Sequence, residues 1–407
     1  MKTAIVGGGA SGMIAAITAA RLGADVTVFE HMNRIGKKIL LTGSGKCNIS
    51  NTDMDISHFH SGCIERVRNV LSECPPEKTG EFWESIGLRL RDRNGYLYPY
   101  SEQASAVLDV LRFTIRDMDI EVHTDTDIKM IEYNGTFVIS TKSGRFTFDR
   151  VIMCCGSCVN RNTGSDGSGY ELAARLGHTV IKPLPALTFL TCEEDFFPSI
   201  AGIRTNANIS IYSSTGANSP VLLGEEYGQL QLTKSGISGI PVFNLSHLAI
   251  RAMDNGEKVC AAIDLIPEID MDEIFLFLKK RAEDLADRTI EEFFIGLLAK
   301  PLGICICKRC MLAMNQKVSS LDERSIDAHC RAVKRFETNV NGSGGFEDAQ
   351  VASGGVDLAQ LNDKLESRIV PGLYFAGEMI DVNGDCGGYN LQWAASSAIV
   401  AGSACNA

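Results

Sequence analysis

The chain has 407 residues, of which 45% are hydrophobic and 22% charged. These proportions are typical of a globular protein and exclude a disordered or fibrous chain, and the length favours two or three domains. Thirty-nine Lys and Arg residues against 50 Asp and Glu residues give a net charge of −11. Because this composition has no basic excess to neutralise phosphates, we expect a small-molecule substrate and no nucleic-acid partner. The composition does not indicate an oligomeric state.

Fourteen cysteines are about twice the number expected from average usage. Secreted disulfide scaffolds are short chains with regular cysteine spacing, whereas this chain is long and its cysteines are irregularly spaced. Glycines interrupt the apolar run Thr3–Ala20, and Cys386–Ala407 is too polar to span a bilayer. We therefore expect reduced thiols in a soluble, cytoplasmic protein with no membrane partner.

The N-terminal segment predicts a strand, a glycine-rich turn, a helix and a second strand. Lys2–Val6 is rich in β-branched residues, Gly7–Gly12 has the spacing GxGxxG, and Met13–Leu22 is rich in alanine. Gly23 ends the helix, because glycine adopts the left-handed conformation without strain. Ala24–Phe29 then alternates as a strand. This order is the context that the dinucleotide-binding fingerprint requires.

The residues of this turn have distinct expected roles. Gly7 makes the tight turn, Gly9 lets the backbone approach a pyrophosphate, and Gly12 permits close packing of helix on strand. The phosphates would lie at the helix N-terminus. Glu30, at the end of the second strand, would accept hydrogen bonds from ribose hydroxyls. The predicted dinucleotide contacts are Gly7, Gly9, Ala10, Ser11, Gly12 and Glu30.

A second glycine-rich loop follows and favours FAD over NAD. It is not a P-loop, because Leu40 replaces the required first glycine and Cys47 replaces the Ser or Thr that binds Mg²⁺. A basic, glycine-rich loop soon after the acidic residue can instead wrap the pyrophosphate and the flavin edge of FAD. The predicted contacts in this loop are Lys37, Lys38, Thr42, Gly43, Ser44, Gly45, Lys46, Cys47 and Asn48.

Three segments in order along the chain resemble one known family. Ile35–Asn51 resembles the GKK…TGxGRCN…TN signature of the YhiN/BaiN-like NAD(P)/FAD-dependent oxidoreductases. Gly345–Val356 resembles that family's GFxxAQVTxGGV segment. Pro371–Glu378 with Gly387–Ala394 resembles its PGLYFAGE…GGYNLQWA ending. The resemblance covers essentially the whole chain.

The resemblance implies an α/β fold with three parts. A doubly wound, Rossmann-like FAD-binding domain would be built from both chain ends, residues 1–188 and 346–407. A β-rich, barrel-like domain would comprise residues 189–250 and 318–345, and a small helical domain residues 251–317. The composition agrees with this, since residues 200–245 are rich in Ile, Val, Thr, Ser and Gly, and residues 271–300 show apolar i, i+3, i+4 spacing.

The C-terminal segment supplies further expected flavin contacts. Gly377-Glu378 follows the strand Leu373–Ala376, where related flavoproteins place an acidic residue near the ribityl chain. The next glycines open a helix whose N-terminus would face the flavin N1–C2=O edge and stabilise negative charge there. A glycine-capped core helix without a ligand is the alternative. The predicted contacts are Gly377, Glu378, Gly387, Gly388, Tyr389, Asn390 and Leu391.

Three segments in the middle of the first domain complete the expected site. Val151–Ser157 is an apolar strand and turn where the family closes an ATGG-like turn over the cofactor, so we expect contacts from Cys155 and Gly156. This sequence departs from the family pattern there by its cysteines. Thr163–Tyr170 resembles a glycine-rich loop of the family and would line the flavin or substrate face. The backbone of Ile128 would contact adenine.

The spacing of some cysteines raises two alternatives, a dithiol redox pair and a metal site. Cys155 and Cys158 form a CxxC, but a redox pair needs a helix N-terminus to lower the thiol pKa, and this pair leaves a strand. We therefore favour small buried side chains. The group Cys305, Cys307 and Cys310 lacks a spaced fourth ligand, and His58, His60 and Cys63 make a still poorer set. We predict no metal site.

These features predict an FAD-dependent oxidoreductase that transfers hydride between NAD(P)H and an organic substrate through tightly bound flavin. No second GxGxxG follows a strand, so NAD(P)H would bind transiently. The resemblance implies reduction of C=C bonds in 3-oxo bile-acid or steroid-like intermediates. An aminoacetone-like amine oxidase that uses oxygen, and a non-catalytic FAD-binding redox sensor, are the alternatives. The sequence identifies no catalytic acid or base.

Overall fold

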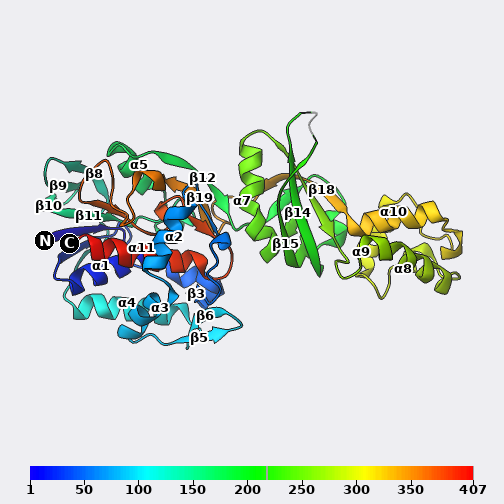
Figure 1. Ribbon diagram of the computed structural model, residues 1–407, viewed down its shortest axis with the longest axis horizontal. Coiled ribbons are helices and arrows are strands. Elements are labelled where there is room, and N and C mark those ends of the chain that lie inside the picture. Colours follow the sequence, from blue (N-terminus) through cyan, green and yellow to red (C-terminus); the bar gives the residue numbers. More distant parts are fainter. Residues whose placement is uncertain (217–218, 407) are drawn as a thin grey trace. The chain divides into compact units, whose positions relative to one another are not determined.

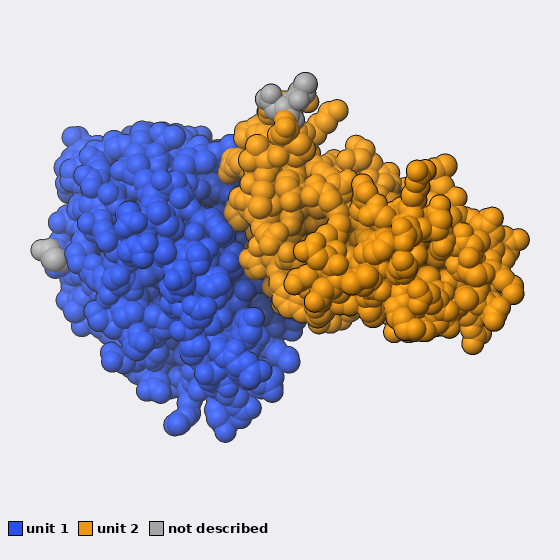
Figure 2. All heavy atoms as spheres, turned by 45° about the vertical axis from the view of Figure 1, so that its right-hand side comes forward, with its two compact units in different colours: residues 1–185, 349–407 blue, residues 186–348 orange. Residues whose placement is uncertain are grey.

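The computed structural model describes residues 1–216 and 219–406 and divides into two compact units (Figure 2). Unit 1 comprises Met1–Pro185 and Ala349–Ala407, and unit 2 comprises Ala186–Asp348. Our predicted boundaries of the first domain lie at residues 188 and 346. The segment that we divided between a β-rich and a helical domain forms one unit.

A parallel sheet forms the centre of unit 1. Its strand order is β20-β11-β1-β2-β7, and every neighbouring pair is parallel. The chain leaves β1 toward β2 on one side, and β11 lies on the other, so the sheet is doubly wound as predicted. The strands are β1 (Lys2–Val6), β2 (Asp25–Phe29), β7 (Glu121–His123), β11 (Arg150–Met153) and β20 (Leu373–Phe375).

Two helices from opposite chain ends pack together on this sheet. Helix α1 (Ala10–Arg21) lies beside α11 (Tyr389–Ala404), as Figure 1 shows. Small residues allow the close approach, since a Cβ at Gly402 would lie 2.9 Å from the carbonyl oxygen of Ala15. Most residues of both helices are buried. The first and last segments of the chain therefore share one core.

Smaller elements surround this core in unit 1. They make a three-stranded sheet β10-β9-β8, a second one β3-β6-β5, and the pairs β12-β19 and β21-β4. Their bounds are β3 (Ser50–Asn51), β4 (Phe59–His60), β5 (Leu90–Arg93), β6 (Tyr96–Pro99), β8 (Ile128–Tyr133), β9 (Phe137–Thr141), β10 (Arg145–Phe148), β12 (Val180–Ala186), β19 (Val351–Val356), β21 (Asn383–Gly384), α2 (Ile64–Glu73), α3 (Pro76–Ser85), α4 (Ala104–Asp117) and α5 (Ser168–Arg175).

Unit 2 contains a closed six-stranded barrel with helix α7 (Ile240–Asp254) packed on it. Alternate residues of the long strands point inward, as the buried Ala207, Ile209 and Ile211 show. The strands, in barrel order, are β13 (Leu190–Cys192), β16 (Gly236–Ser238), β15 (Val221–Leu232), β14 (Arg204–Ser214), β17 (Lys258–Asp264) and β18 (Phe336–Ser343). The barrel-like fold predicted for the insertion is confirmed.

The structure divides the insertion differently from our ranges. Strand β17 belongs to the barrel although it lies within residues 251–317, and helix α10 (Glu323–Lys334) lies within residues 318–345. Strand β17 pairs with both β14 and β18, and so closes the barrel through contacts that local composition does not reveal. The remaining helices are α6 (Phe197–Ile200), α8 (Met271–Asp284) and α9 (Lys300–Arg309). Among the described residues, no helix is long and apolar enough to cross a membrane.

Candidate functional site

A cavity of about 550 Å³ lies in unit 1, where β1, β2 and β11 end. Val6, Phe29 and Cys154 mark these strand ends in its wall. The chain turns to opposite sides of the sheet here, which is where open α/β sheets bind ligands. Many predicted contacts line the cavity, namely Gly7, Gly9, Ala10, Ser11, Glu30, Lys37, Lys38, Thr42, Ile128, Cys155, Gly156, Glu378, Asn390 and Leu391.

The three fingerprint glycines differ in what surrounds them. Gly7 has a φ of 104°, and a Cβ there would lie 2.5 Å from the carbonyl oxygen of Cys154. A Cβ at Gly12 would lie 1.9 Å from the carbonyl oxygen of Gly7, so no side chain fits between helix and strand. Gly9 has no atom within 4 Å of its Cβ position and faces the cavity. Two glycines therefore serve the turn, and the third leaves room for a ligand.

Glu30 closes the turn with its buried carboxylate. Its Oε2 accepts a hydrogen bond from the Gly8 amide at 2.9 Å, and its Oε1 accepts one from the Met32 amide at 2.8 Å. A carboxylate has about four lone-pair positions, so acceptor capacity remains on the side that lines the cavity. This is the capacity that ribose hydroxyls would use.

An ion pair joins the second loop to the C-terminal segment inside the cavity. The Nζ of Lys38 lies 2.6 Å from Oε2 of Glu378, and both side chains are partly buried. The other carboxylate oxygen accepts from the Ser157 hydroxyl at 2.8 Å and from the Ala352 amide at 3.3 Å. Glu378 is therefore held by three segments of the chain, and its ion pair holds the Lys38 side chain at the cavity wall.

The second loop adopts a 3₁₀ conformation over Lys37–Gly45, interrupted at Thr42, Gly43 and Ser44. Gly43 and Ser44 have φ values of 55° and 53°, which turn the chain away from the cavity. Lys46 points to Glu102, 3.8 Å away. The predicted contacts of this loop that do not line the cavity are Gly43, Ser44, Gly45, Lys46, Cys47 and Asn48. In other segments, Gly12, Gly377, Gly387, Gly388 and Tyr389 do not line it either.

The cavity wall also contains residues that sequence reasoning did not assign. Loop residues between β7 and β8, beside Ile128, line one end, and Gln350 and Val351 line another part. The Thr163–Tyr170 segment, which we expected near the flavin or substrate, contributes several members. That expected segment supplies Thr163, Gly164, Ser165, Asp166 and Ser168. Lining residues without a sequence assignment include His31, Thr126, Asp127, Lys129, Arg175 and Trp393. For His31 and the loop after β7, the position after a strand end is a signal that topology could have supplied.

The thiols at the site are protonated. Burial raises the pKa of Cys155 to about 12 and raises that of Cys154 further, with smaller contributions from neighbouring acidic groups. Burial also raises the pKa of Cys47 to about 11, against a hydrogen bond with Thr42. All fourteen cysteines are described and are free thiols. None of these three thiols is a nucleophile at neutral pH.

The first turn of α11 forms one end of the cavity wall. Gly388 precedes the helix with a φ of 98°, and a Cβ there would lie 2.5 Å from the carbonyl oxygen of Ser50. Asn390 and Leu391 line the cavity. The Asn390 side chain accepts from the Gly384 amide at 2.8 Å and donates to the Gly384 carbonyl at 2.7 Å. Strand β21 thus holds the helix start against the cavity.

A protein family and individual relatives match this chain over almost its full length. The HI0933-like protein Rossmann domain family matches residues 1–404. The 3-dehydro-bile acid delta(4,6)-reductase of Clostridium scindens is 38% identical over 407 residues, which cover 99% of this chain and 98% of that protein. The ribosomal RNA dihydrouridine synthase of Haemophilus influenzae is 28% identical over 404 residues, covering 97% of this chain and 96% of that protein.

A solved structure of similar extent is 3-ketosteroid-delta4-(5alpha)-dehydrogenase from Rhodococcus jostii RHA1, in complex with 4-androstene-3,17-dione. It is 15% identical in sequence, and the superposition has a TM-score of 0.49. The match covers 100% of this chain and 96% of the other.

Proposed function

Because the chain belongs to the HI0933-like Rossmann-domain family, we propose that it is an FAD-dependent oxidoreductase whose cofactor occupies the cavity of unit 1. The observation that carries this proposal is the cradle at the end of β1. Gly7 and Gly12 leave no space for a side chain, Gly9 opens to the cavity, and Glu30 faces it. This donor and acceptor set suits a pyrophosphate at a helix N-terminus with a ribose beside it. The residues therefore fit FAD.

The chain's own groups would bind the cofactor along the length of the cavity. Glu30 would accept from the ribose of the adenosine half, with Ile128 beside the adenine. The amides at the start of α1 would donate to the pyrophosphate. Glu378, with Lys38, would lie near the ribityl chain, and the α11 N-terminus would face the N1–C2=O edge. Its partial positive charge would favour the reduced state.

We propose reduction of a C=C bond in a 3-oxo bile-acid or steroid-like substrate as the reaction. FAD held by these residues would supply two-electron transfer between NAD(P)H and the substrate. The relative that is 38% identical is named for such a reduction, and it matches this chain over nearly its full length. The protein's contribution is to hold the reactants together and to exclude water from the cavity.

A second candidate is reduction of a C=C bond in an RNA base. The relative that is 28% identical is named for dihydrouridine synthesis in ribosomal RNA. In addition, the β5-β6 hairpin carries cross-strand pairs of Arg91 with Tyr98 and of Arg93 with Tyr96, and paired residues share a face. Basic and aromatic side chains together suit single-stranded RNA. Glu102 lies 3.5 Å from Arg91 and 2.9 Å from Arg93 and neutralises part of this charge.

An anaerobic reduction experiment and a parallel assay in air separate the candidates. The purified protein is expected to show a flavin spectrum that NADH or NADPH bleaches, and a 3-oxo-4-ene steroid acid is expected to restore it. Restoration by a uridine-containing ribosomal RNA fragment, and not by the steroid, would support the second candidate. Peroxide formed from an amine in air would instead indicate the oxidase. A protein that contains flavin and responds to none of these would be a redox sensor, and one that binds no flavin would overturn the proposal.

A further inference from the structure

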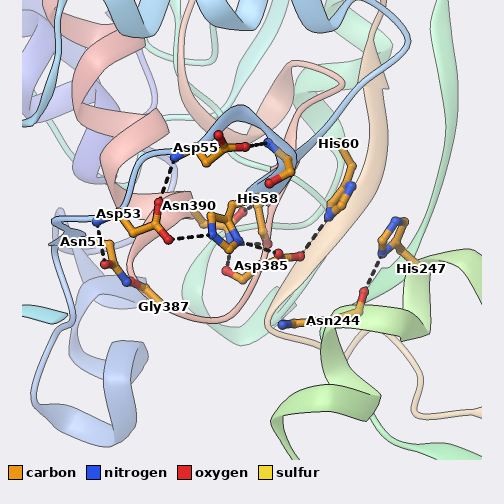
Figure 3. Close-up of polar contacts among 12 residues, drawn as sticks. Asn51, Asp53, Asp55, His58, His60, Asn244, His247, Asp385, Gly387 and Asn390 are labelled. Atoms are coloured by element: carbon orange, nitrogen blue, oxygen red, sulfur yellow. Dashed lines mark hydrogen bonds and ion pairs between the residues drawn. The ribbon is translucent and has the colours of Figure 1, made fainter. Parts of the chain in front are cut away.

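Two histidines share one buried carboxylate beside the first turn of α11 (Figure 3). The Nδ1 of His58 lies 3.0 Å from Oδ2 of Asp385, and the Nε2 of His60 lies 2.8 Å from Oδ1. The Asp385 side chain is 8% exposed, whereas the two imidazoles are 29% and 30% exposed. The carboxylate is therefore buried, and both imidazoles reach solvent from which they can exchange protons.

The backbone holds this cluster in place. Strand β4 pairs with β21 so that His60 lies opposite Asn383, and the Asp385 amide donates to the His58 carbonyl at 3.0 Å. His58 and Asp385, which are 327 positions apart in the sequence, thus meet at the end of one short sheet. The strand pairing brings the backbones of the two segments together, so the side chains of the cluster start close to one another.

Both ring nitrogens of His58 face carboxylates. Its Nε2 lies 3.4 Å from Asp53, on the side opposite Asp385. A neutral imidazole donates from one nitrogen only, whereas an imidazolium donates from both, so this arrangement suits the charged ring. Burial lowers the pKa of His58, but the hydrogen bonds to Asp385 and Asp53 outweigh burial and leave the pKa raised. Asp55, which caps the 3₁₀ turn Ile56–His58, also attracts the charge.

The cluster is joined directly to the cavity wall. The His58 ring stacks on Tyr389 with 4.5 Å between centroids, and Tyr389 is the first residue of α11. The next residue, Asn390, lines the cavity and donates from Nδ2 to the Asp385 carbonyl at 3.3 Å. A change of charge at this end of the cavity therefore acts on His58 across one layer of side chains.

We propose that His58 is a redox-linked protonation site, which takes up a proton when electrons enter the cavity and releases it when they leave. The inference rests on the proposed FAD site. Negative charge added near the α11 N-terminus would favour the imidazolium, and by linkage a protonated His58 would make reduction more favourable by the same factor. His58 acts through the helix start, and Asp385 positions it.

The proton count agrees with the proposed reaction. Reducing a C=C bond consumes two electrons and two protons and forms two C–H bonds. One proton travels with the electron pair as hydride from NAD(P)H. The second proton comes from water. His58 would take up one proton as two electrons enter the cavity and release one as the electrons pass to the substrate, so that the second C–H bond forms with no net change at the cluster. The imidazole regains its starting protonation at the end of the cycle.

The test is the midpoint potential of the bound flavin, measured by spectroelectrochemistry from pH 5.5 to 9 in the wild type and His58→Gln. Glutamine keeps a donor for Asp385 and cannot titrate. A tenfold coupling raises the wild-type potential above that of the variant by about 30 mV at the acidic end, for a two-electron couple. The difference should vanish as the pH rises. A difference that is absent, or constant with pH, would overturn the inference.

Two further variants provide a control and a second test of His58. His329→Gln removes an imidazole from unit 2, which contributes no residue to the cavity wall, so its potentials should equal those of the wild type at every pH. Asp53→Asn changes an exposed side chain and should move the pH-dependent region toward acid, which decides the matter if His58→Gln loses flavin. If the pH-dependent region of the potential were the same in Asp53→Asn as in the wild type, His58 would not be the group that titrates. A wild type without reducible flavin would instead disprove the proposed function.

Discussion

A methyl group at two glycines of the first turn would meet very different surroundings. At Gly12 the methyl would overlap the Gly7 carbonyl, while at Gly9 it would meet nothing within 4 Å. The backbone at Gly9 has a φ of −76°, which alanine adopts freely. The same chemical change therefore separates a requirement of the fold from a requirement of the ligand.

We expect Gly12→Ala to destabilise the protein by about 1–3 kcal/mol through overpacking, and to lower its melting temperature by several degrees. Gly9→Ala should melt with the wild type but bind FAD at least tenfold more weakly, because its methyl occupies the pyrophosphate approach. Thermal melts and flavin titration of the apoprotein measure both. Equal melting temperatures for the two variants would contradict the assignment.

The cysteines of the site behave as small apolar side chains. The Sγ of Cys155 points to the Val6 carbonyl at 3.4 Å, and its pKa of about 12 leaves almost no thiolate at pH 8. This agrees with our preference for buried side chains over a redox pair, although Cys158 with Cys155 has CxxC spacing. The spacing alone does not decide thiol chemistry, because burial sets the fraction of thiolate.

Replacing both residues, Cys155→Ala and Cys158→Ala, should leave the rate of flavin reduction by NAD(P)H within about twofold of the wild-type rate, since the thiols would carry no electrons. Stopped-flow absorbance measures this rate. In the wild type, iodoacetamide at pH 8 should label the half-buried Cys63 before Cys155, as peptide mass spectrometry would show. A charge-transfer band on reduction, lost in the double variant, would restore the dithiol mechanism.

At the scale of elements, helix α10 contains a buried histidine. His329 donates from Nδ1 to the Ser325 carbonyl, and its Nε2 is buried without a hydrogen-bond partner among the described residues. Phe293 and Phe294 pack on the ring. Burial lowers the pKa of His329, against the hydrogen bond to Ser325. The neutral ring is the form that docks the helix.

Acid should therefore loosen α10. The folded-state pKa lies below the ordinary value near 6.5, so the stabilisation is complete above about pH 6.5 and is lost as the pH falls toward the folded-state pKa. Hydrogen exchange of α10 peptides at pH 7.5 and 5.5, corrected for intrinsic rates, measures this. His329→Leu should reduce the acid effect. Equal acid effects in both proteins would show that other groups are responsible.

Elements with strong local signals could be predicted from sequence, and those defined by pairing could not. Strand β1 has the predicted bounds Lys2–Val6, and α1 begins three residues before the predicted Met13 because its first turn includes the glycine motif. By contrast, β17 lies in a range that we expected to be helical. Its place depends on hydrogen bonds to β14 and β18, and local patterns carry little information about such distant partners.

At the scale of the whole molecule, the insertion interrupts unit 1 in the sequence but leaves its core continuous. The Asp357 amide donates to the Thr179 carbonyl, and Gly354 lies against Lys182, so β12 and β19 run antiparallel. The two ends of unit 1 at Pro185 and Ala349 are therefore close. Every residue that lines the cavity belongs to unit 1.

A chain in which a short Gly-Ser linker replaces residues 186–348 should retain FAD, because its cavity wall is complete. We expect absorbance near 450 nm after purification and an affinity within about tenfold of the full-length chain. Ultrafiltration with fluorescence detection of free flavin measures it. A folded chain without flavin, checked by circular dichroism, would show that unit 2 is required for cofactor binding.

The sequence by itself determined the nucleotide cradle and the class of fold. Gly7, Gly9, Gly12 and Glu30 lie within one short segment, where spacing alone fixes the backbone course, and family motifs at both ends identify the shared domain. Only the tertiary structure decided which charges meet. Lys38 pairs with Glu378 across 340 positions, and the histidine cluster forms across a similar separation. Such pairs depend on strand pairing between distant segments, a non-local interaction that no local pattern of residues encodes.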